Sequence, residues 1–291
     1  MALDPRKIVL GWPNYIASAT LAGGSWLPTL PLTHVQDRRT AVVAKSASLN
    51  AADTRFTITL PKRRRLHVLA ISAHNLSPTA TLRARVYRDA EQTDLIYDSG
   101  VQNVWPVLYT LNDVIWGDDN FWNRRLSEDD RASYTPLTTL FFDERQIGTA
   151  VDVEISDPSN PDSAVEIGRV MLADAWQPDY NISYGVQHGY NTGTTLTEAR
   201  DSNRTEYADV VTPKRTVSFD LAFLDEEEAF LRLHRLQRTQ DISGEILYLY
   251  SVTPTPANFA RAMICRQTDL NPITHPYFAN FENGMNLLEI L

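Results

Sequence analysis

The stretch VEIGRVMLADAWQPDYNISY, residues 165–184, divides the sequence into two parts of different character. Residues 165–173 are apolar apart from Glu166, Gly168 and Arg169, which is typical of a buried strand. The sequence WQP at 176–178 then ends this strand, because proline cannot donate a hydrogen bond to a sheet. The chain before it is rich in strand patterns, and the chain after it begins with a loop rich in Gly, Asn and Thr. We therefore expect a first domain over residues 1–176 and a second over residues 177–291.

The first domain shows the pattern of an antiparallel β-sandwich. Residues 55–60 alternate polar and apolar, residues 66–72 are nearly continuously apolar, and residues 81–87 alternate again with Leu82, Ala84 and Val86 expected to point inward. Alternation indicates a half-buried strand, and a continuous apolar run indicates a central one. Turn signals separate these strands with no helix between them, which favours a β-sandwich.

Further expectations concern the connections in this domain. We expect a short strand at residues 39–45, after a turn entered at residues 32–35. Pro61 and the basic residues 62–65 predict a solvated turn. Residues 137–143 and 151–156 predict two more strands. The sequence DPSNPDS, residues 157–163, predicts a turn that pairs the strand at 151–156 with the strand at 165–173 as a hairpin.

The second domain is expected to be β-rich with one short helix. Residues 185–200 indicate either a flexible arm or a long hairpin. Residues 214–223, 245–252, 262–266 and 285–290 predict strands. The helix is expected at residues 225–240, with Asp225 as N-cap, acidic residues 226–228 at its positive end, and an apolar stripe. That stripe consists of Ala229, Phe230, Leu233 and Leu236.

Composition excludes several classes of protein. The chain is 43% apolar and 22% charged, which is enough for packed cores and argues against disorder. The net charge of −9 offers no basic field for nucleic acid. The longest apolar runs, such as residues 66–73, are too short to span a membrane. The N-terminal sequence MALDPRK lacks the apolar core of a signal peptide, so we expect synthesis in a reducing cytoplasm.

A search for catalytic and metal-binding patterns predicts no enzyme, no cofactor and no metal site. The six histidines show no metal-ligand spacing, and no phosphate-binding or nucleophile motif is present. Cys265 lies in an apolar run and is expected to be a small core residue. The acidic runs at 118–119 and 128–130 could offer oxygen ligands to Ca²⁺, but they match no loop template, so a solvated surface is favoured.

The segment 88–135 is the best candidate for recognition. It combines three tryptophans with Asp, Asn and Arg in a long stretch of little regular pattern, and such long loops are usually functional. Aromatic rings stack on sugar faces while charged and amide groups grip hydroxyls. A carbohydrate site would use Trp116, Asp119, Phe121, Trp122 and Arg124. The alternative is that these aromatics close the end of the sandwich or line a subunit interface.

Several stretches together resemble a known family. They are LHVLAISAHNLS, WGDDNFW, VDVEISDPSNPDSAVEIGRVMLADAWQP and NISYG. Over residues 5–250 the chain is similar to minor tail proteins of tailed bacteriophages, which have a galactose-binding-like jelly roll in their first half. The resemblance implies a mainly β fold with an N-terminal galactose-binding-like β-sandwich. Residues 214–252 resemble tail-tube and distal-tail modules.

The resemblance implies a structural component of a phage tail tip or baseplate, located in the virion. Its expected partners are copies of itself in a threefold or sixfold ring, and tail-tube, distal-tail or hub proteins. The helix face with Phe230, Arg232, Arg235 and Arg238 is the expected docking surface. The alternative is a receptor-binding module that binds host surface glycan through the jelly roll. A glycan hydrolase is a third hypothesis, but no placed pair of carboxylates supports it.

Overall fold

The structure is a computed structural model that describes residues 3–198 and 205–291. It forms two compact units. The first comprises the described residues of Met1–Pro178 together with Glu245–Ile264, and the second comprises those of Asp179–Gly244 together with Cys265–Leu291. Antiparallel strands dominate both units, so the predicted mainly β class is confirmed. The domain boundary predicted at residue 176 lies near the first division, and residues 245–264 pack with the first unit.

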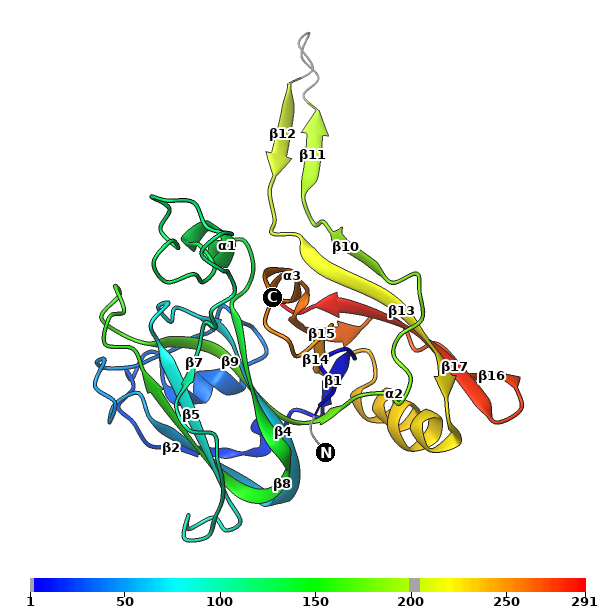
Figure 1. Ribbon diagram of the computed structural model, residues 1–291, viewed down its shortest axis with the longest axis horizontal. Coiled ribbons are helices and arrows are strands. Elements are labelled where there is room, and N and C mark those ends of the chain that lie inside the picture. The colour runs from blue at the N-terminus through cyan, green and yellow to red at the C-terminus, as the bar shows by residue number, and fades with distance from the viewer. Residues whose placement is uncertain (1–2, 199–204) are drawn as a thin grey trace. The chain divides into compact units, whose positions relative to one another are not determined.

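Two long strands organise the first unit, β4 (Phe56–His74) and β8 (Leu137–Ser156) (Figure 1). They pair with each other along most of their length, with register shifts between Thr59 and Arg64 and between Leu66 and Val68. Such irregularities bend strands and increase their twist. The two ends of each long strand therefore belong to different layers.

Each layer contains one end of β4 and one end of β8. In the first layer, the start of β4 pairs with β2 (Thr20–Ala22), and the end of β8 pairs with β5 (Thr81–Tyr87). Strand β5 pairs in turn with β6 (Leu95–Asp98) and β7 (Gln102–Asn103). In the second layer, the end of β4 lies between the start of β8 and β9 (Glu166–Trp176). That layer is extended by β1 (Val9–Trp12), β3 (Ala44–Lys45) and β14 (Ile246–Leu249).

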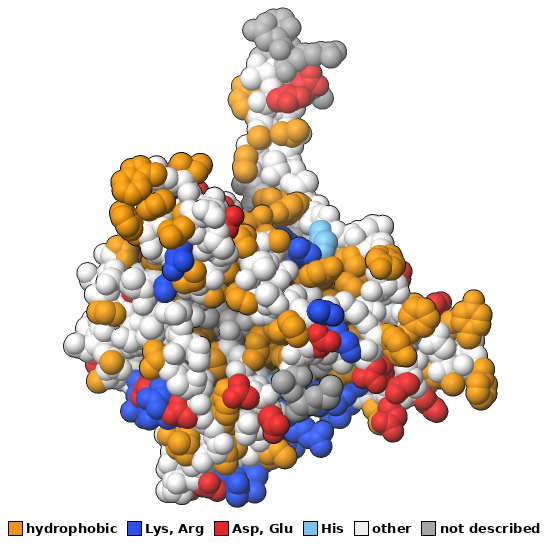
Figure 2. All heavy atoms as spheres, in the orientation of Figure 1, with side chains coloured by type: hydrophobic (Ala, Val, Ile, Leu, Met, Phe, Trp, Pro, Cys, Tyr) orange, Lys and Arg blue, Asp and Glu red, His pale blue; other side chains and the backbone are white. Residues whose placement is uncertain are grey.

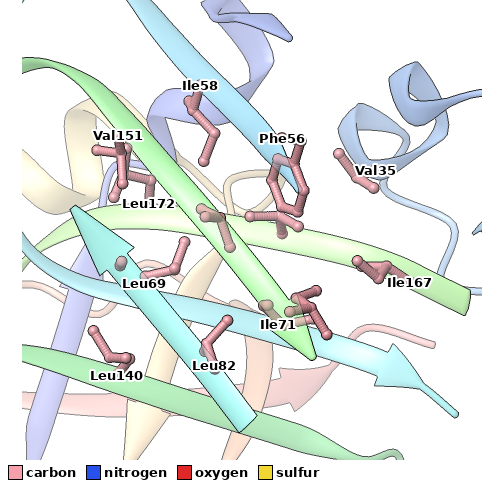
Figure 3. Close-up of a cluster of buried hydrophobic side chains, with 14 of the residues drawn as sticks. Val35, Phe56, Ile58, Leu69, Ile71, Leu82, Leu140, Val151, Ile167 and Leu172 are labelled. Carbon is pink, nitrogen blue, oxygen red and sulfur yellow. The ribbon is translucent and has the colours of Figure 1, made fainter. Parts of the chain in front are cut away.

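Apolar side chains from both layers meet in one core (Figure 3). Predicted inward residues Leu82, Ala84 and Val86 are buried, which confirms the alternation in β5. The labelled members of the core are Val35, Phe56, Ile58, Leu69, Ile71, Leu82, Leu140, Val151, Ile167 and Leu172. Full burial of one such side chain stabilises a fold by roughly 1.5–3 kcal/mol, so this shared core holds the two layers together.

Three predicted connections of the first unit are wrong. Residues 62–65 are not a turn but part of the continuous strand β4, where the shifted register accommodates Pro61. The end of β8 does not form a hairpin with β9, because β4 lies between them. The strand expected at 39–45 is reduced to β3, which follows the 3₁₀-helix η2 (Leu32–Gln36) and a turn. Short helices complete this unit: η1 (Tyr15–Ser18), α1 (Glu128–Ala132) and α3 (Pro256–Arg261).

The second unit is an antiparallel sheet with one helix. The sheet order is β10 (Gln187–Asn191), β13 (Lys214–Leu224), β17 (Asn280–Glu289) and the end of β15 (Met263–Gln267), and β16 (Thr274–Tyr277) forms a hairpin with β17. The predicted helix is present as the π-helical η3 (Glu228–His234) followed by α2 (Arg235–Gln240). Its buried face contains Ala229, Leu233 and Leu236, whereas Phe230 is 45% exposed and so departs from the predicted stripe.

The segment expected as an arm or a hairpin is a hairpin in the described residues. Within the described ranges, strands β11 (Thr195–Glu198) and β12 (Glu206–Asp209) pair only with each other, and both are exposed throughout. They extend from the end of the sheet near β10 and β13 (Figure 1). Residues 199 and 200 of the predicted segment lie outside the described part of the chain.

Candidate functional site

The loop at residues 104–127 is fixed at both ends by buried side chains. Val104, Trp105 and Leu126 are each 4% exposed. The indole Nε1–H of Trp105 donates a hydrogen bond to the carbonyl of Leu76 at 2.9 Å, and its ring lies edge-on to the ring of His74, with centroids 5.5 Å apart. Trp105 is therefore the aromatic residue that closes the sandwich.

The middle of the same loop presents three aromatic rings to solvent. Trp116 and Trp122 are 76% and 80% exposed, which contradicts a role for them in closing the sandwich. With Phe121 they form the aromatic cluster, in which each pair of rings meets edge to face at centroid distances of 5.0 to 5.6 Å. Figure 2 shows hydrophobic side chains gathered on the surface over this region.

Asp119 and Arg124 hold the loop by their own contacts. The carboxylate of Asp119 accepts a hydrogen bond from the backbone N–H of Glu128 at 2.8 Å, at the first turn of α1. Arg124 has a φ of 53°, and its carbonyl accepts hydrogen bonds from the N–H groups of Leu108 and Tyr109 at 3.0 and 3.1 Å. The structure thus brings Trp116, Phe121 and Trp122 together, while Asp119 and Arg124 shape the loop that carries them.

The acidic run at 128–130 has a local structural explanation. It forms the first turn of α1, where the hydroxyl of Ser127 accepts from the N–H of Asp130 at 3.1 Å and caps the helix. Negative side chains are favourable at this end of a helix, because the unpaired N–H groups carry partial positive charge.

A cavity of about 520 Å³ lies in the first unit beside the buried ends of this loop. Aromatic rings of Tyr97, Trp105 and Phe259 line it together with polar side chains that include Gln102 and Asn258. Burial, together with the charge of Asp143, raises the pKa of Tyr97 above its ordinary value. Sequence reasoning missed this cavity, because its walls come from segments more than 100 residues apart in the chain.

The residues of the predicted docking surface lie along the helix of the second unit. Phe230 packs against Phe281, with ring centroids 5.4 Å apart, and remains 45% exposed. Arg235 and Arg238 are exposed, Arg232 is half-buried, and neither Arg235 nor Arg238 forms a salt bridge with a residue that the structure describes. Whether this surface docks another chain stays a prediction.

Cys265 is fully buried, as expected of a core residue. Burial raises the pKa of its thiol well above the ordinary value, which disfavours the reactive thiolate. Among the described residues, no helix is long and apolar enough to cross a bilayer.

No protein-family model and no curated protein matches this chain. Among solved structures, it is similar to CpGH89CBM32-4 produced by Clostridium perfringens, in complex with glcNAc-α-1,4-galactose, at 13% identity and a TM-score of 0.33, over 55% of this chain and 93% of that one. It is also similar to a His 62 mutant of the lectin binding domain of Lectinolysin complexed with Lewis b. The identity is 12% and the TM-score 0.36, over 56% of this chain and 96% of that one. A third similar structure is the family 32 carbohydrate-binding module from Streptococcus pneumoniae EndoD. The identity is 12% and the TM-score 0.34, over 56% of this chain and 99% of that one.

The first unit defines the class of protein, a mainly β chain with an N-terminal antiparallel β-sandwich. Its candidate site consists of the aromatic cluster and the loop that carries it. At identities of 10–13% the similar structures assign no ligand to this chain.

Proposed function

We propose that the first unit is a non-catalytic module that binds glycan through the aromatic cluster. One observation carries this proposal: Trp116 and Trp122 are more than three-quarters exposed and are nevertheless packed edge to face with Phe121. Large apolar side chains that gather at the surface mark sites of interaction. Edge-to-face packing fixes the rings before a ligand arrives.

The chemistry around the cluster suits an amphipathic ligand such as a sugar. A sugar ring has an apolar C–H face that stacks on aromatic rings and a rim of hydroxyls that seeks polar partners. Asp118 and Arg124 lie in the same loop, and the guanidinium of Arg124 forms no salt bridge with a described residue. The backbone contacts of Leu108 and Tyr109 with Arg124 limit the ordering that binding would require.

Replacing Trp122 by alanine is expected to weaken glycan binding about tenfold or more, since truncation of a central aromatic contact usually costs over 1 kcal/mol. Trp116→Ala should act in the same direction. The ligand is first selected on an array of bacterial surface glycans, and affinity is then measured by calorimetric titration. Tyr184→Ala is the matched control, because Tyr184 is fully exposed and lies in the second unit.

The glycan proposal fails under either of two results. One is that no surface glycan binds the wild-type protein. The other is that both tryptophan variants, with unchanged circular dichroism, bind as tightly as wild type. Their folds should persist, because both side chains are mostly outside the core.

A structural role in a phage tail tip is the second candidate, with the protein made in the host cytoplasm and built into the virion. The specific observation in its favour is the β11–β12 hairpin, which pairs with no other strand among the residues that the structure describes and exposes Leu196 by 66% and Tyr207 by 62%. A two-stranded hairpin alone is marginally stable in water. Contact with a neighbouring copy or a tail protein would stabilise it.

This second candidate predicts a threefold or sixfold oligomer, or assembly with purified tail-tube, distal-tail or hub proteins. Sedimentation velocity measures the mass of the assembly. Leu196→Ser with Tyr207→Ser should reduce association, because both side chains lose apolar surface. A protein that is strictly monomeric and also binds no tail component removes this candidate.

A further inference from the structure

Three carboxylates converge in the second unit, from Asp179, Asp225 and Glu228. One oxygen from each lies within 4.8 Å of the others. Asp225 immediately precedes the helix, Glu228 lies in its first turn, and Asp179 is on the segment that enters the unit. Local capping explains only part of this arrangement.

Two backbone hydrogen bonds use one oxygen of two of these carboxylates. Oδ1 of Asp225 accepts from the N–H of Glu228 at 2.6 Å, which confirms the predicted N-cap. Oε1 of Glu228 accepts from the N–H of Asp179 at 2.8 Å. The other oxygen of Glu228, Oε2, is buried and has no hydrogen-bond partner among the described residues. Glu228 as a whole is 8% exposed, so bulk water does not solvate this oxygen well.

Neither Asp225 nor Glu228 forms a salt bridge with a residue in the described part of the chain. Burial, and the charges of Asp179 and Asp225, raise the pKa of Glu228 above its ordinary value. A buried carboxylate with an unpaired oxygen is costly unless it is protonated or finds a cation.

We propose that Asp179, Asp225 and Glu228 bind one divalent cation of the Ca²⁺ type. Ca²⁺ takes carboxylate and water oxygens at roughly 2.3–2.6 Å, so oxygens up to about 4.8 Å apart can share one ion. Asp179 and Asp225 are exposed, which leaves one side of the ion open to water ligands. Mg²⁺ demands stricter geometry and keeps its own waters, so it should bind more weakly. The ion would tie the incoming segment to the start of the helix and stabilise the second unit.

The test uses the full chain after removal of metal with EDTA. Titration calorimetry with CaCl₂ should show one site with a dissociation constant on the order of 10⁻⁴ to 10⁻³ M, the range of exposed calcium sites with few charged ligands. Scanning calorimetry should show a higher unfolding temperature with Ca²⁺ than without it, because the ion binds the native state. MgCl₂ in place of CaCl₂ should give a smaller rise.

Two nearly isosteric variants separate metal binding from capping. Asp225→Asn keeps a good N-cap, and Glu228→Gln keeps an oxygen to accept from Asp179, while each removes one negative charge. Each should weaken Ca²⁺ binding about tenfold or more and reduce the calcium-dependent rise in unfolding temperature. Glu226→Gln, an exposed neighbour outside the cluster, should bind Ca²⁺ as wild type does.

The proposal is overturned if wild type shows neither binding heat nor a thermal shift at about 10 mM Ca²⁺, well above the range for such sites. It is equally overturned if Asp225→Asn and Glu228→Gln bind Ca²⁺ as tightly as wild type. Tighter binding of Mg²⁺ than of Ca²⁺ would overturn the assigned class of ion. These calcium results do not depend on whether the tryptophan variants lose glycan binding, so the two proposals can fail separately.

Discussion

Replacing Glu245 by alanine is expected to destabilise the first unit by about 3–5 kcal/mol, the usual cost of breaking a buried ion pair. Arg169 is 2% exposed, and its Nη2 donates to Oε2 of Glu245 at 2.5 Å. Its Nη1 donates to the carbonyl of Val35 at 3.0 Å, and the amide of Asn14 donates to the same Glu245 oxygen at 2.8 Å. Without Glu245 the guanidinium would stay in the interior without its ion-pair partner.

Tryptophan fluorescence is suited to this measurement, because all six tryptophans lie in the first unit. Urea unfolding gives the free energy for wild type, Glu245→Ala, Arg169→Met and the double variant Arg169→Met with Glu245→Leu. The double variant should lie within about 2 kcal/mol of wild type, because an apolar pair can replace a buried ion pair at little cost. Arg39→Ala, which breaks an exposed pair with Asp37, should lie close to wild type, because solvent screens exposed ion pairs.

A different outcome has a clear meaning here. If Glu245→Ala loses less than about 1 kcal/mol, the exposed Arg38, whose Nε lies 3.5 Å from Oε1 of Glu245, would have to be its principal partner. If the double variant is as unstable as the less stable single variant, the attraction between Arg169 and Glu245 would exceed the cost of burying their charges.

This ion pair also illustrates where sequence reasoning ends. The strands around it were predictable, because burial on both faces of β9 leaves the apolar run at residues 170–173, and one buried face of β5 leaves the alternation of Leu82, Ala84 and Val86. Nothing local indicates that Glu245 belongs beside Arg169. The contact joins residues 76 positions apart and brings residues 245–264 back to the first unit.

The wrong hairpin has the same cause. A short turn at residues 157–163 between two strand patterns favours pairing of neighbours in sequence. In the structure β4 lies between β8 and β9 instead, and β4 begins about 80 positions before β8 in the sequence. Gly168 supports that arrangement, since a Cβ atom there would lie 2.4 Å from the carbonyl oxygen of Thr40 and 2.8 Å from Cβ of Ala73.

For the candidate site, the composition of the sequence identified the loop but did not show which of its tryptophans are buried and which are exposed. Trp105 and Trp116 belong to the same irregular segment of the sequence, yet one is 4% and the other 76% exposed. The difference depends on Leu76, whose carbonyl receives the Trp105 indole, and on His74 beneath it. In the carboxylate cluster the N-cap role of Asp225 was predictable, whereas the approach of Asp179 was not, because it depends on tertiary packing.

Acidification is expected to destabilise the first unit from pH 6.5 downward, because His74 is buried in its neutral form. Burial lowers the pKa of His74 from 6.5 to about 3. Its Nδ1 accepts a hydrogen bond from the N–H of Leu76 at 3.3 Å, and its Nε2 lies 3.0 Å from the hydroxyl oxygen of Thr138. A neutral imidazole ring can make both of these hydrogen bonds, because its unprotonated Nδ1 is free to accept. Between these two pKa values the unfolded chain binds a proton that the native state excludes, so stability falls as pH falls.

The expected loss is about 1.4 kcal/mol per pH unit from this one residue, between pH 6.5 and 3. His67 adds to the same slope, since burial lowers its pKa as well, whereas the depressed carboxyl pKa values of Asp89 and Asp98 act only below about pH 4. Urea unfolding between pH 4.5 and 7, followed by tryptophan fluorescence, gives the slope. His74→Gln should show a shallower slope than wild type, and the exposed His234→Gln should match wild type. An unchanged slope in His74→Gln would mean that His74 takes up its proton without unfolding, and that its site opens to water in the native state.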